Sequence, residues 1–498
     1  MGLSTAFSIG QSSLAAVALE ANTVSRNIAG TNVSGIFSDK NANLTTLPGG
    51  GVQVVSITNS QNQALFDGLL SATSANAAQN AIAGGLSTLQ ETVGDTNSDT
   101  SPASQISDFI DALQTYEATP SNSSLGSQVV TAAQNLTATL NTATTTVQQV
   151  REQADQGMTS AVATINSLLA QFQTVNTQIS VGTAANADIT DLEDTRSNIL
   201  SQLSQQIGIS TVSGPQNTMS VYTDSGVALF QGGTASSVTF QPTGTYTSGT
   251  TGNAVFVDGV PITGTSSPMP LQSGAIAGLA TLRDDTAVTY QNQLDQIANS
   301  LINATSENFI SAGNATAPGL FTFTGSTGTP PSMPASATGL AGLIEVNPAV
   351  DPSQGGNPSL IRDGINFDFN AAANGGVDDA SFSTQLQNLL NNMNANQTFS
   401  ASGGIATSNT ISGYASASVS WLEAQRQNSS NETTFQSTLL ANTTSAFTNA
   451  TGVSLDSELS KMLDLEQSYS ASAQLMTTVN QMFTSLITSV QTAVGNAA

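Results

Sequence analysis

Both ends of the chain repeat apolar residues at alternating intervals of four and three positions, which is the spacing of a coiled-coil seam. At the N-terminus all members but one are apolar: Leu3, Phe7, Gly10, Leu14, Val17, Ala21, Val24 and Ile28. At the C-terminus all members but two are apolar: Leu455, Leu459, Met462, Glu466, Tyr469, Ala473, Met476, Asn480, Phe483, Ile487 and Val490. A single helix cannot bury such a stripe, so the pattern predicts that the terminal helices pair with each other and with neighbouring copies.

Helical spacing of apolar residues returns in several long segments between the two ends. It predicts helices at 60–93, from Pro102 through Leu113, and at 123–181, 189–207, 276–309 and 411–447. The segment 123–181 is far longer than the three turns of an average helix. These lengths indicate a rod built from a bundle of long helices.

Two segments break the helical pattern and predict β-rich insertions. From Gly208 to about Pro270, apolar residues such as Val221 and Leu229 stand among turns rich in Gly, Ser, Thr and Pro. Residues 311–402 are the most irregular part, and we interpret them as an exposed second insertion with short strands at 320–323, 343–346 and 367–369. Closer to the N-terminus, residues 41–51 are predicted to be a loop and 52–57 a strand.

These segments together predict a mainly α protein with β insertions, folded as a discontinuous multidomain rod. Residues 1–40 and 451–498 form a terminal coiled-coil domain in which the heptad helices pair. A long-helix bundle comprises 41–208, 271–310 and 403–450, a β-rich insert 209–270, and a loop- and β-rich outer insert 311–402. Such a layout is typical of a self-assembling structural subunit.

Charge is scarce and mostly negative, which narrows the classes of partner. Only 8% of the 498 residues are charged, and the net charge is −25. Nucleic acid is repelled by such a surface, and no apolar stretch is long enough to span a membrane. Cys and His are absent, which excludes thiolate and imidazole catalysis and the usual zinc sites. We therefore expect no catalytic residues, no cofactor, no metal ion, no nucleic-acid partner and no membrane insertion.

Neighbouring carboxylates occur twice, at Asp284-Asp285 and at Asp378-Asp379. Adjacent residues usually point apart, so we interpret both pairs as turn or solvated-face residues. A glycosidase within 311–402 stays open as an alternative, because its two carboxylates would have to face each other across a cleft, which a sequence does not show.

Three stretches carry recognisable motifs. In residues 21–35 (ANTVSRNIAGTNVSG) a helix ends in Asn27 and Ile28 and is followed by Asn32 and Gly35. The second stretch, LEDTRSNILSQLSQQIGI, contains Asp194 and Arg196, and a return to helix follows at Gly274, Gly278, Leu282 and Arg283. The third begins with GVSLD at 452–456 and continues with Glu458, Leu459, Gln467, Tyr469, Ala473 and Phe483.

These motifs resemble the flagellar hook-associated protein 1 family, the first of two hook–filament junction proteins. The corner motif of Asn27, Asn32 and Gly35 resembles one shared with rod and hook subunits. Its usual continuation, an aromatic residue followed by Ser/Thr-Arg, is replaced here by Ile36, Phe37, Ser38 and Asp39. Asp194 and Arg196 resemble the Asp-x-Arg helix of the family, and the C-terminal motif resembles the signature of axial flagellar proteins. The resemblance covers about the helical two thirds of the chain.

The resemblance implies a structural role and a set of partners. Subunits would form a ring at the hook–filament junction, with the terminal helices as an inner tube, and would contact the hook subunit and the second junction protein. An export chaperone would cover the C-terminal helix until secretion, and the protein would be extracellular without a cleaved signal peptide. Alternatives are another axial flagellar protein, such as the hook subunit or the second junction protein, and a secreted adhesin.

The polar seam positions Glu466 and Asn480 allow two interpretations. A polar residue in a seam often fixes the register between helices at a cost in stability. Alternatively, both side chains simply face water where the packing is loose.

Overall fold

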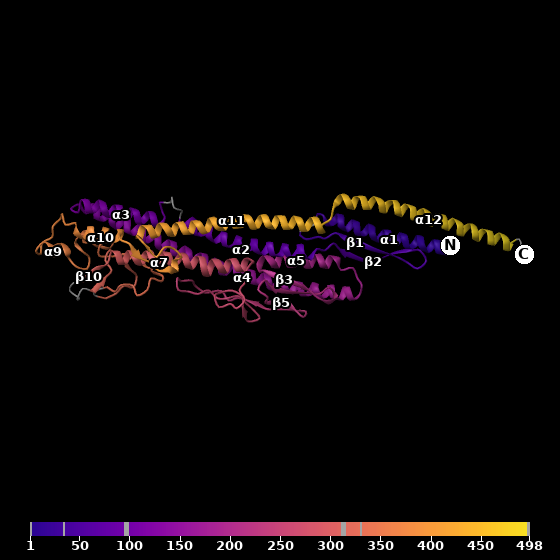
Figure 1. Ribbon diagram of the computed structural model, residues 1–498, viewed down its shortest axis with the longest axis horizontal. Helices are drawn as coiled ribbons and strands as arrows, with labels where there is room; N and C mark the ends of the chain where they lie inside the picture. The colour runs from indigo at the N-terminus through magenta and orange to yellow at the C-terminus, as the bar shows by residue number, and fades with distance from the viewer. Residues whose placement is uncertain (1, 33–34, 94–98, 310–314, 329–330, 496–498) are drawn as a thin grey trace.

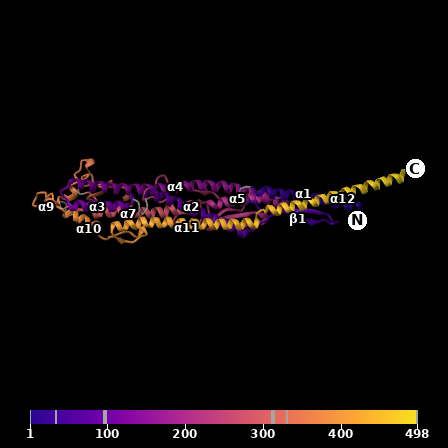
Figure 2. The same ribbon diagram turned by 90° about the horizontal axis from the view of Figure 1, so that it is seen from above.

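The computed structural model describes residues 2–32, 35–93, 99–309, 315–328 and 331–495, and it is an elongated rod with both termini at one end (Figure 1). Two terminal helices and a hairpin form that end, which we call the terminal module: α1 (Leu3–Gly30), β1 (Lys40–Thr46), β2 (Val52–Asn59) and α12 (Leu455–Gly495). In both views α12 reaches beyond the N-terminal end of α1 (Figure 2). The rest of the chain forms a longer part, which we call the body.

Long helices dominate the body, as the sequence predicted: α2 (Gln63–Val93), α3 (Pro102–Ala118), α4 (Ser123–Ala184), α5 (Thr190–Gln206), α6 (Ala275–Thr281), α7 (Ala287–Ala304) and α11 (Ile411–Thr451). Helix α11 packs along α2, while α4 contacts α2, α3, α5 and α7. The helix expected over 276–309 is interrupted by a π-helical turn at Leu282–Thr286 and ends at Ala304.

The 62-residue helix α4 is the spine of the body. Its N-terminus is capped by Asn122, whose side chain accepts a hydrogen bond from the Ser124 N–H. One face follows the intervals of four and three, with an extra interval of four at Ala154–Met158, and all of its members are buried: Val129, Ala133, Leu136, Leu140, Ala143, Val147, Val150, Ala154, Met158, Ala161, Ile165, Leu168, Phe172, Val175 and Ile179. The body therefore covers this seam completely.

The core of the body is divided into two hydrophobic clusters, one on each side of the extra interval in α4. Between them lie Arg151 and Asp155, both almost fully buried. Asp155 accepts a hydrogen bond from Arg283 of the π-helical turn (2.6 Å) and another from Tyr246 (2.8 Å). Asp284 pairs with the same Arg283 (2.7 Å), so this carboxylate lies in a helix and neutralises a buried cation, and its interpretation as a solvated turn residue was wrong.

The predicted β-rich segment after Gly208 forms two small antiparallel sheets. The first has the order β3-β4-β5-β6: β3 (Ile209–Ser213), β4 (Met219–Thr223), β5 (Ala228–Gln231) and β6 (Thr234–Ala235). The second has the order β7-β8-β9: β7 (Val238–Thr239), β8 (Phe256–Val257) and β9 (Val260–Pro261). Both sheets pack on α4, where Phe230 meets Phe172 edge to face (5.0 Å between ring centres) and Asn166 hydrogen-bonds both ways with the Val238 backbone.

The outer insert is more closely integrated than the sequence suggested. Three two-stranded pairs and three short helices lie in or beside it: β10 (Glu307–Phe309) with β11 (Ala315–Ala317), β12 (Phe321–Phe323) with β13 (Ile344–Val346), β14 (Gln397–Thr398) with β15 (Ser408–Asn409), α8 (Leu360–Asp363), α9 (Phe369–Ala373) and α10 (Thr384–Asn394). Phe321 packs against Phe109 of α3 (5.2 Å), and both belong to one core with α4 and α7. The description of this segment as an exposed insertion was therefore wrong for apolar residues such as Phe321, Ile344 and Leu386, which are buried.

Two local predictions in these regions were also wrong. The strand expected at 367–369 is absent from the described chain there, because Asp368 caps a helix by accepting a hydrogen bond from the Ala371 N–H (2.8 Å). Residues 41–51, expected to be a loop, contain β1, which pairs with β2 from Lys40–Asn59 to Thr46–Val52. The resulting hairpin lies along α1, whereas the sequence had assigned residues from 41 onward to the bundle.

Candidate functional site

The terminal module is held together by an antiparallel pair of helices, α1 and α12. At its distal end Phe7 meets Phe483 edge to face, with 6.3 Å between ring centres. In the middle, the hydroxyl oxygens of Ser13 and Ser472 lie 3.1 Å apart. At the end nearest the body, the Asn27 side chain donates a hydrogen bond to Glu458 (3.0 Å).

The predicted N-terminal seam lies on the covered side of α1. Val17 and Val24 are buried, and the other apolar members are half-buried: Leu3, Phe7, Leu14, Ala21 and Ile28. Gly10 is also buried, and a Cβ there would lie 2.8 Å from the sulfur of Met476. Its missing side chain thus allows α12 to approach closely.

The predicted C-terminal seam is divided between covered and exposed positions. Met462, Ala473, Met476 and Phe483 are half-buried, but the remaining apolar members are exposed: Leu455, Leu459, Tyr469, Ile487 and Val490. Seven covered positions of α12 define a different frame: Glu458, Met462, Leu465, Ser472, Met476, Val479 and Phe483. Three of them are members of the predicted seam, and each of the other four lies one residue before a predicted member. Glu466 and Asn480 are exposed and lie outside this frame.

Ten large apolar side chains of α12 are uncovered in the subunit. They are between 44% and 65% exposed: Leu455, Leu459, Leu463, Tyr469, Leu475, Met482, Leu486, Ile487, Val490 and Val494. We call this set the α12 outer stripe. Many exposed large apolar side chains on one helix indicate a site of interaction with another molecule.

The corner motif places a buried amide between α1, β1 and α12. The side chain of Asn27 is fully buried and donates hydrogen bonds to Asp39 (2.8 Å), to the Lys40 carbonyl (2.9 Å) and to Glu458 (3.0 Å). Its carbonyl oxygen accepts a hydrogen bond from the Lys40 N–H (3.0 Å). A donor and acceptor on one side chain are needed here, which explains why this position suits Asn.

Asn32 and Gly35, the other members of the motif, have different environments. Asn32 is exposed. Gly35 has a φ of +111°, and a Cβ there would lie 2.5 Å from the Asn198 side chain. Asn198 of α5 uses this space to bind the backbone of Ile36 in both directions (2.7 and 2.8 Å).

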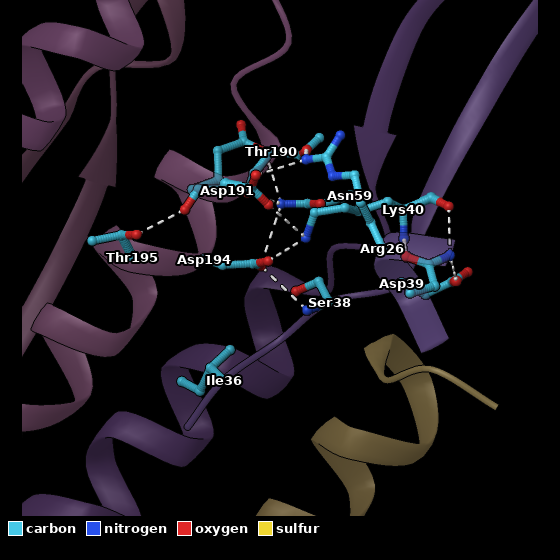
Figure 3. Close-up of polar contacts among 12 residues, drawn as sticks. Arg26, Ile36, Ser38, Asp39, Lys40, Asn59, Thr190, Asp191, Asp194 and Thr195 are labelled. Atoms are coloured by element: carbon cyan, nitrogen blue, oxygen red, sulfur yellow. Dashed lines mark hydrogen bonds and ion pairs between the residues drawn. The ribbon is translucent and has the colours of Figure 1, made fainter. Parts of the chain in front are cut away.

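Ion pairs join the terminal module to the body, and we call them the clasp (Figure 3). Lys40, whose side chain is fully buried, pairs with Asp194 (2.5 Å) and lies 3.4 Å from Asp191. Arg26 pairs with Asp188 (2.6 Å) and Asp191 (2.8 Å). Both cations belong to the module, and all three carboxylates lie in α5 or directly before it.

The pKa values of two clasp carboxylates, Asp194 and Asp188, shift in opposite directions. Burial raises the pKa of Asp194, and the hydrogen bond from Lys40 offsets part of this rise. Burial acts in the same direction on Asp188, but hydrogen bonds from Thr190 and Arg26 outweigh it and hold the pKa of Asp188 below its ordinary value. Asp188 is therefore held in its charged form more firmly than the more deeply buried Asp194.

Asp194 and Arg196 of the predicted Asp-x-Arg motif face different partners. Asp194 accepts hydrogen bonds from Lys40 and from the Ser38 N–H (3.2 Å), both in the N-terminal segment. Arg196 donates to the Asn217 carbonyl (2.5 Å) within the β-rich segment. The two side chains thus connect α5 to neighbours on different sides.

Several residues of this site were missed by the sequence reasoning. The usual continuation of the corner motif is an aromatic residue followed by Ser/Thr and then Arg. Here Phe37 and Ser38 fill the first two places, and the basic residue, Lys40, comes one position later than in that pattern because Asp39 intervenes. The Lys40 ammonium lies 3.7 Å from the centre of the Phe37 ring. The signal was a lone Lys in a chain with eight basic residues, two positions after an aromatic-Ser pair.

Metal-binding clusters and membrane-spanning helices bear on the class of protein. In the described ranges, no three His, Cys, Asp or Glu side chains cluster in a way that could hold a metal ion. No helix within the same ranges has the length and apolarity needed to cross a membrane.

Comparison with known proteins connects these features to a family. The model for the helical domain of flagellar hook-associated protein FlgK matches residues 86–310, and the model for the C-terminal region of flagellar basal body rod FlgEFG proteins matches 444–489. The chain is thus similar to the flagellar hook-associated protein 1 family. The second match covers the end of α11 and most of α12.

Individual relatives of this family are similar over about half of the chain. Flagellar hook-associated protein 1 of Escherichia coli K12 is 27% identical over 293 residues, which cover 56% of this chain and 52% of the relative. The protein of the same name from Salmonella typhimurium is 27% identical over 290 residues, covering 56% and 51%. The chain thus spans about half the length of these relatives. The flagellar hook junction protein FlgK from Burkholderia pseudomallei has 23% identity and a TM-score of 0.42, over 52% of this chain and 46% of that one.

Proposed function

We propose that the protein is a structural subunit of the bacterial flagellum that forms the hook–filament junction ring. It assembles through the terminal module, and it connects hook to filament outside the cell after export. Its partners are further copies of the chain, the hook subunit, the second junction protein and an export chaperone that covers α12. We assign it no catalytic role.

The observation that carries this proposal is the absence of charge on the distal part of the terminal module. Residues 2–19 and 467–495 contain no Asp, Glu, Lys or Arg, although the whole chain has a net charge of −25. Copies of such a chain repel each other wherever their acidic surfaces meet. The uncharged end, which carries the α12 outer stripe from Tyr469 onward, is therefore the surface on which copies can approach without that repulsion.

Deletion of the gene in the native organism tests the role. We expect hooks without filaments by electron microscopy and flagellin lost to the medium by gel. Loss of the hooks themselves would assign the chain to the rod or hook, which is the alternative that the match at 444–489 favours. Intact filaments in the deletion strain would contradict a flagellar junction role.

Complementation with variants tests the assembly surface. We expect the double variant Leu486→Ser/Val490→Ser to leave the monomer folded but to fail to restore filaments, because both side chains are more than half exposed in the subunit. Val377→Ser is the matched control, since Val377 is 71% exposed but lies in the outer insert. Full restoration by the double variant would contradict assembly through the outer stripe.

A further inference from the structure

The connection between terminal module and body is narrow. Two covalent links cross it, residues 60–62 between β2 and α2 and residues 452–454 between α11 and α12. Within the described parts of the chain, β2 and α5 are the one pair of elements that packs across this joint with more than marginal contact. Two thin links and little packing are the structural features of a hinge.

Asp39 ties both links together at one point. Its N–H donates to the carbonyl of Thr451 at the end of α11 (2.7 Å), and its own carbonyl accepts from the Ser60 N–H just after β2 (2.7 Å). Its side chain accepts from Asn27, which also binds Glu458 of α12. The backbone of Asp39 is therefore hydrogen-bonded to both links, and it serves as their common pivot.

A cavity of about 480 Å³ separates the two parts beside this pivot. One wall is formed by the end of α1 and the residues that follow it, including Gly30, Ile36 and Phe37. The opposite wall belongs to the body, with Leu69 of α2 and Phe447 near the end of α11. Ile36 packs against the apolar core of the body at the edge of this cavity, and the remaining space allows the module to move toward the body.

We propose that the joint is a lockable pivot, in which the clasp of Arg26 and Lys40 with Asp188, Asp191 and Asp194 holds the terminal module at one angle to the body. The clasp is the one ionic contact across this joint among the described residues, and it joins module cations to body anions throughout. When it opens, the module turns as a unit about Asp39, because α1, α12 and the hairpin remain joined through Asn27 and the helix contact. The device sets the orientation of the assembly surface without changing that surface.

Spin-label distances in the free monomer test the pivot directly, and they do not depend on the proposed junction role. The chain has no Cys, so labels attach only at introduced positions. Asn442→Cys on α11 with Ser470→Cys on α12 spans the joint, and both side chains are exposed. Gln178→Cys with Asn442→Cys reports on the body alone, and Asn22→Cys with Ser470→Cys on the module alone.

We expect one narrow distance distribution across the joint in the otherwise native chain. In Lys40→Met and in Arg26→Gln that distribution should broaden or shift, while both internal pairs stay unchanged. Lys40→Arg, which keeps the charge, should restore the narrow distribution in part. Arg26 is partly exposed, so Arg26→Gln keeps the test valid where Lys40→Met fails to fold.

Three outcomes would overturn the proposal. An unchanged distance across the joint in a folded Arg26→Gln variant would mean that packing, not the clasp, fixes the angle. A broad distribution in the native chain would mean that no lock exists. Broadening of the distance between labels at Asn22 and Ser470 in the variants would show that the module unfolds instead of turning as a unit.

Discussion

Helices α4 and α12 carry the same kind of apolar repeat but differ in how much of it is covered. In α4 every member of the seam is buried, because α2, α3, α5 and α7 surround it. In α12 the main contact among the described elements is with α1, and the outer stripe is between 44% and 65% exposed. The same periodicity thus gives a fully buried seam in α4 and a partly exposed apolar surface in α12. The difference teaches that a heptad repeat predicts a need for partners but not where those partners come from.

The largest difference between the two helices should appear on truncation of a single leucine. Leu140→Ala in α4 should lower the free energy of unfolding by about 2–5 kcal/mol, because it leaves a cavity in a fully buried core. Leu486→Ala in α12 should change it by less than about 0.5 kcal/mol, because the side chain already faces water. Denaturant unfolding of the monomer measures both. Equal destabilisation would mean that the outer stripe is covered in solution.

How much of this was predictable depends on whether the signal was local. The buried seam of α4 and the strands after Gly208 follow from periodicity and turn residues, which act over short distances along the chain. Helix α10 was missed because Asn-rich segments have low helix propensity, and its Leu386 and Met393 are stabilised by contacts with distant helices.

The joint was predicted only in part, for a similar reason. Asn27, Gly35 and Asp194 were singled out through the family motif, and the structure brings them to one place. Lys40 was missed because an ion pair between residues 154 positions apart leaves no periodic trace in a sequence, and Asp39 because its role depends on backbone hydrogen bonds to Thr451 and Ser60. Alternate positions of the predicted α12 seam face away from α1 in the subunit, and the pattern alone does not distinguish residues that contact α1 from residues available to neighbouring copies.

The second prediction concerns Asn27, where the terminal module is as well buried as the core of the body. Asn27→Ala should destabilise the module, because it leaves buried partners of this side chain without hydrogen bonds, at about 1–3 kcal/mol for each unsatisfied group. Hydrogen exchange should speed up at the Lys40 amide and around Glu458 while α4 stays protected. Asn32→Ala, in the same motif but exposed, is the matched control and should have little effect. If both variants behave alike, the buried amide does not hold the module together.

The third prediction uses pH to act on the body. Burial raises the pKa of Asp295 and of Glu307, which accept backbone hydrogen bonds from the outer insert. In the window between the ordinary and the raised pKa, the folded chain binds more protons than the unfolded one. Stability should therefore rise as pH falls through this window, by about 1.4 kcal/mol for each unit of pKa shift. Asp188 acts oppositely, but its contribution is lost only below the ordinary carboxyl range because its pKa is lowered.

Thermal unfolding between pH 7 and pH 4.5 measures this effect. The melting temperature should increase over the upper part of that range, and Glu307→Gln should reduce the increase, since the amide does not titrate. A melting temperature that falls steadily from pH 7 would show that these carboxylates are not held at raised pKa values in the folded body.

The smallest effect on the monomer should come from Asn480→Leu, and it decides between the two frames of α12. The frame read from the sequence places Asn480 in the seam, whereas the structure leaves its side chain exposed. In the observed frame, the substitution should change the free energy of unfolding of the monomer by less than about 0.5 kcal/mol. If Asn480 lies in the contact with α1 instead, Leu should stabilise the monomer clearly, because it replaces a buried amide in a seam with an apolar side chain. Glu466→Gln is the control, because it removes a charge but keeps a polar side chain at another exposed position of the same helix. A stabilised monomer would mean that α12 pairs with α1 through the predicted seam, and the outer stripe would then have to be redefined around Leu465 and Val479.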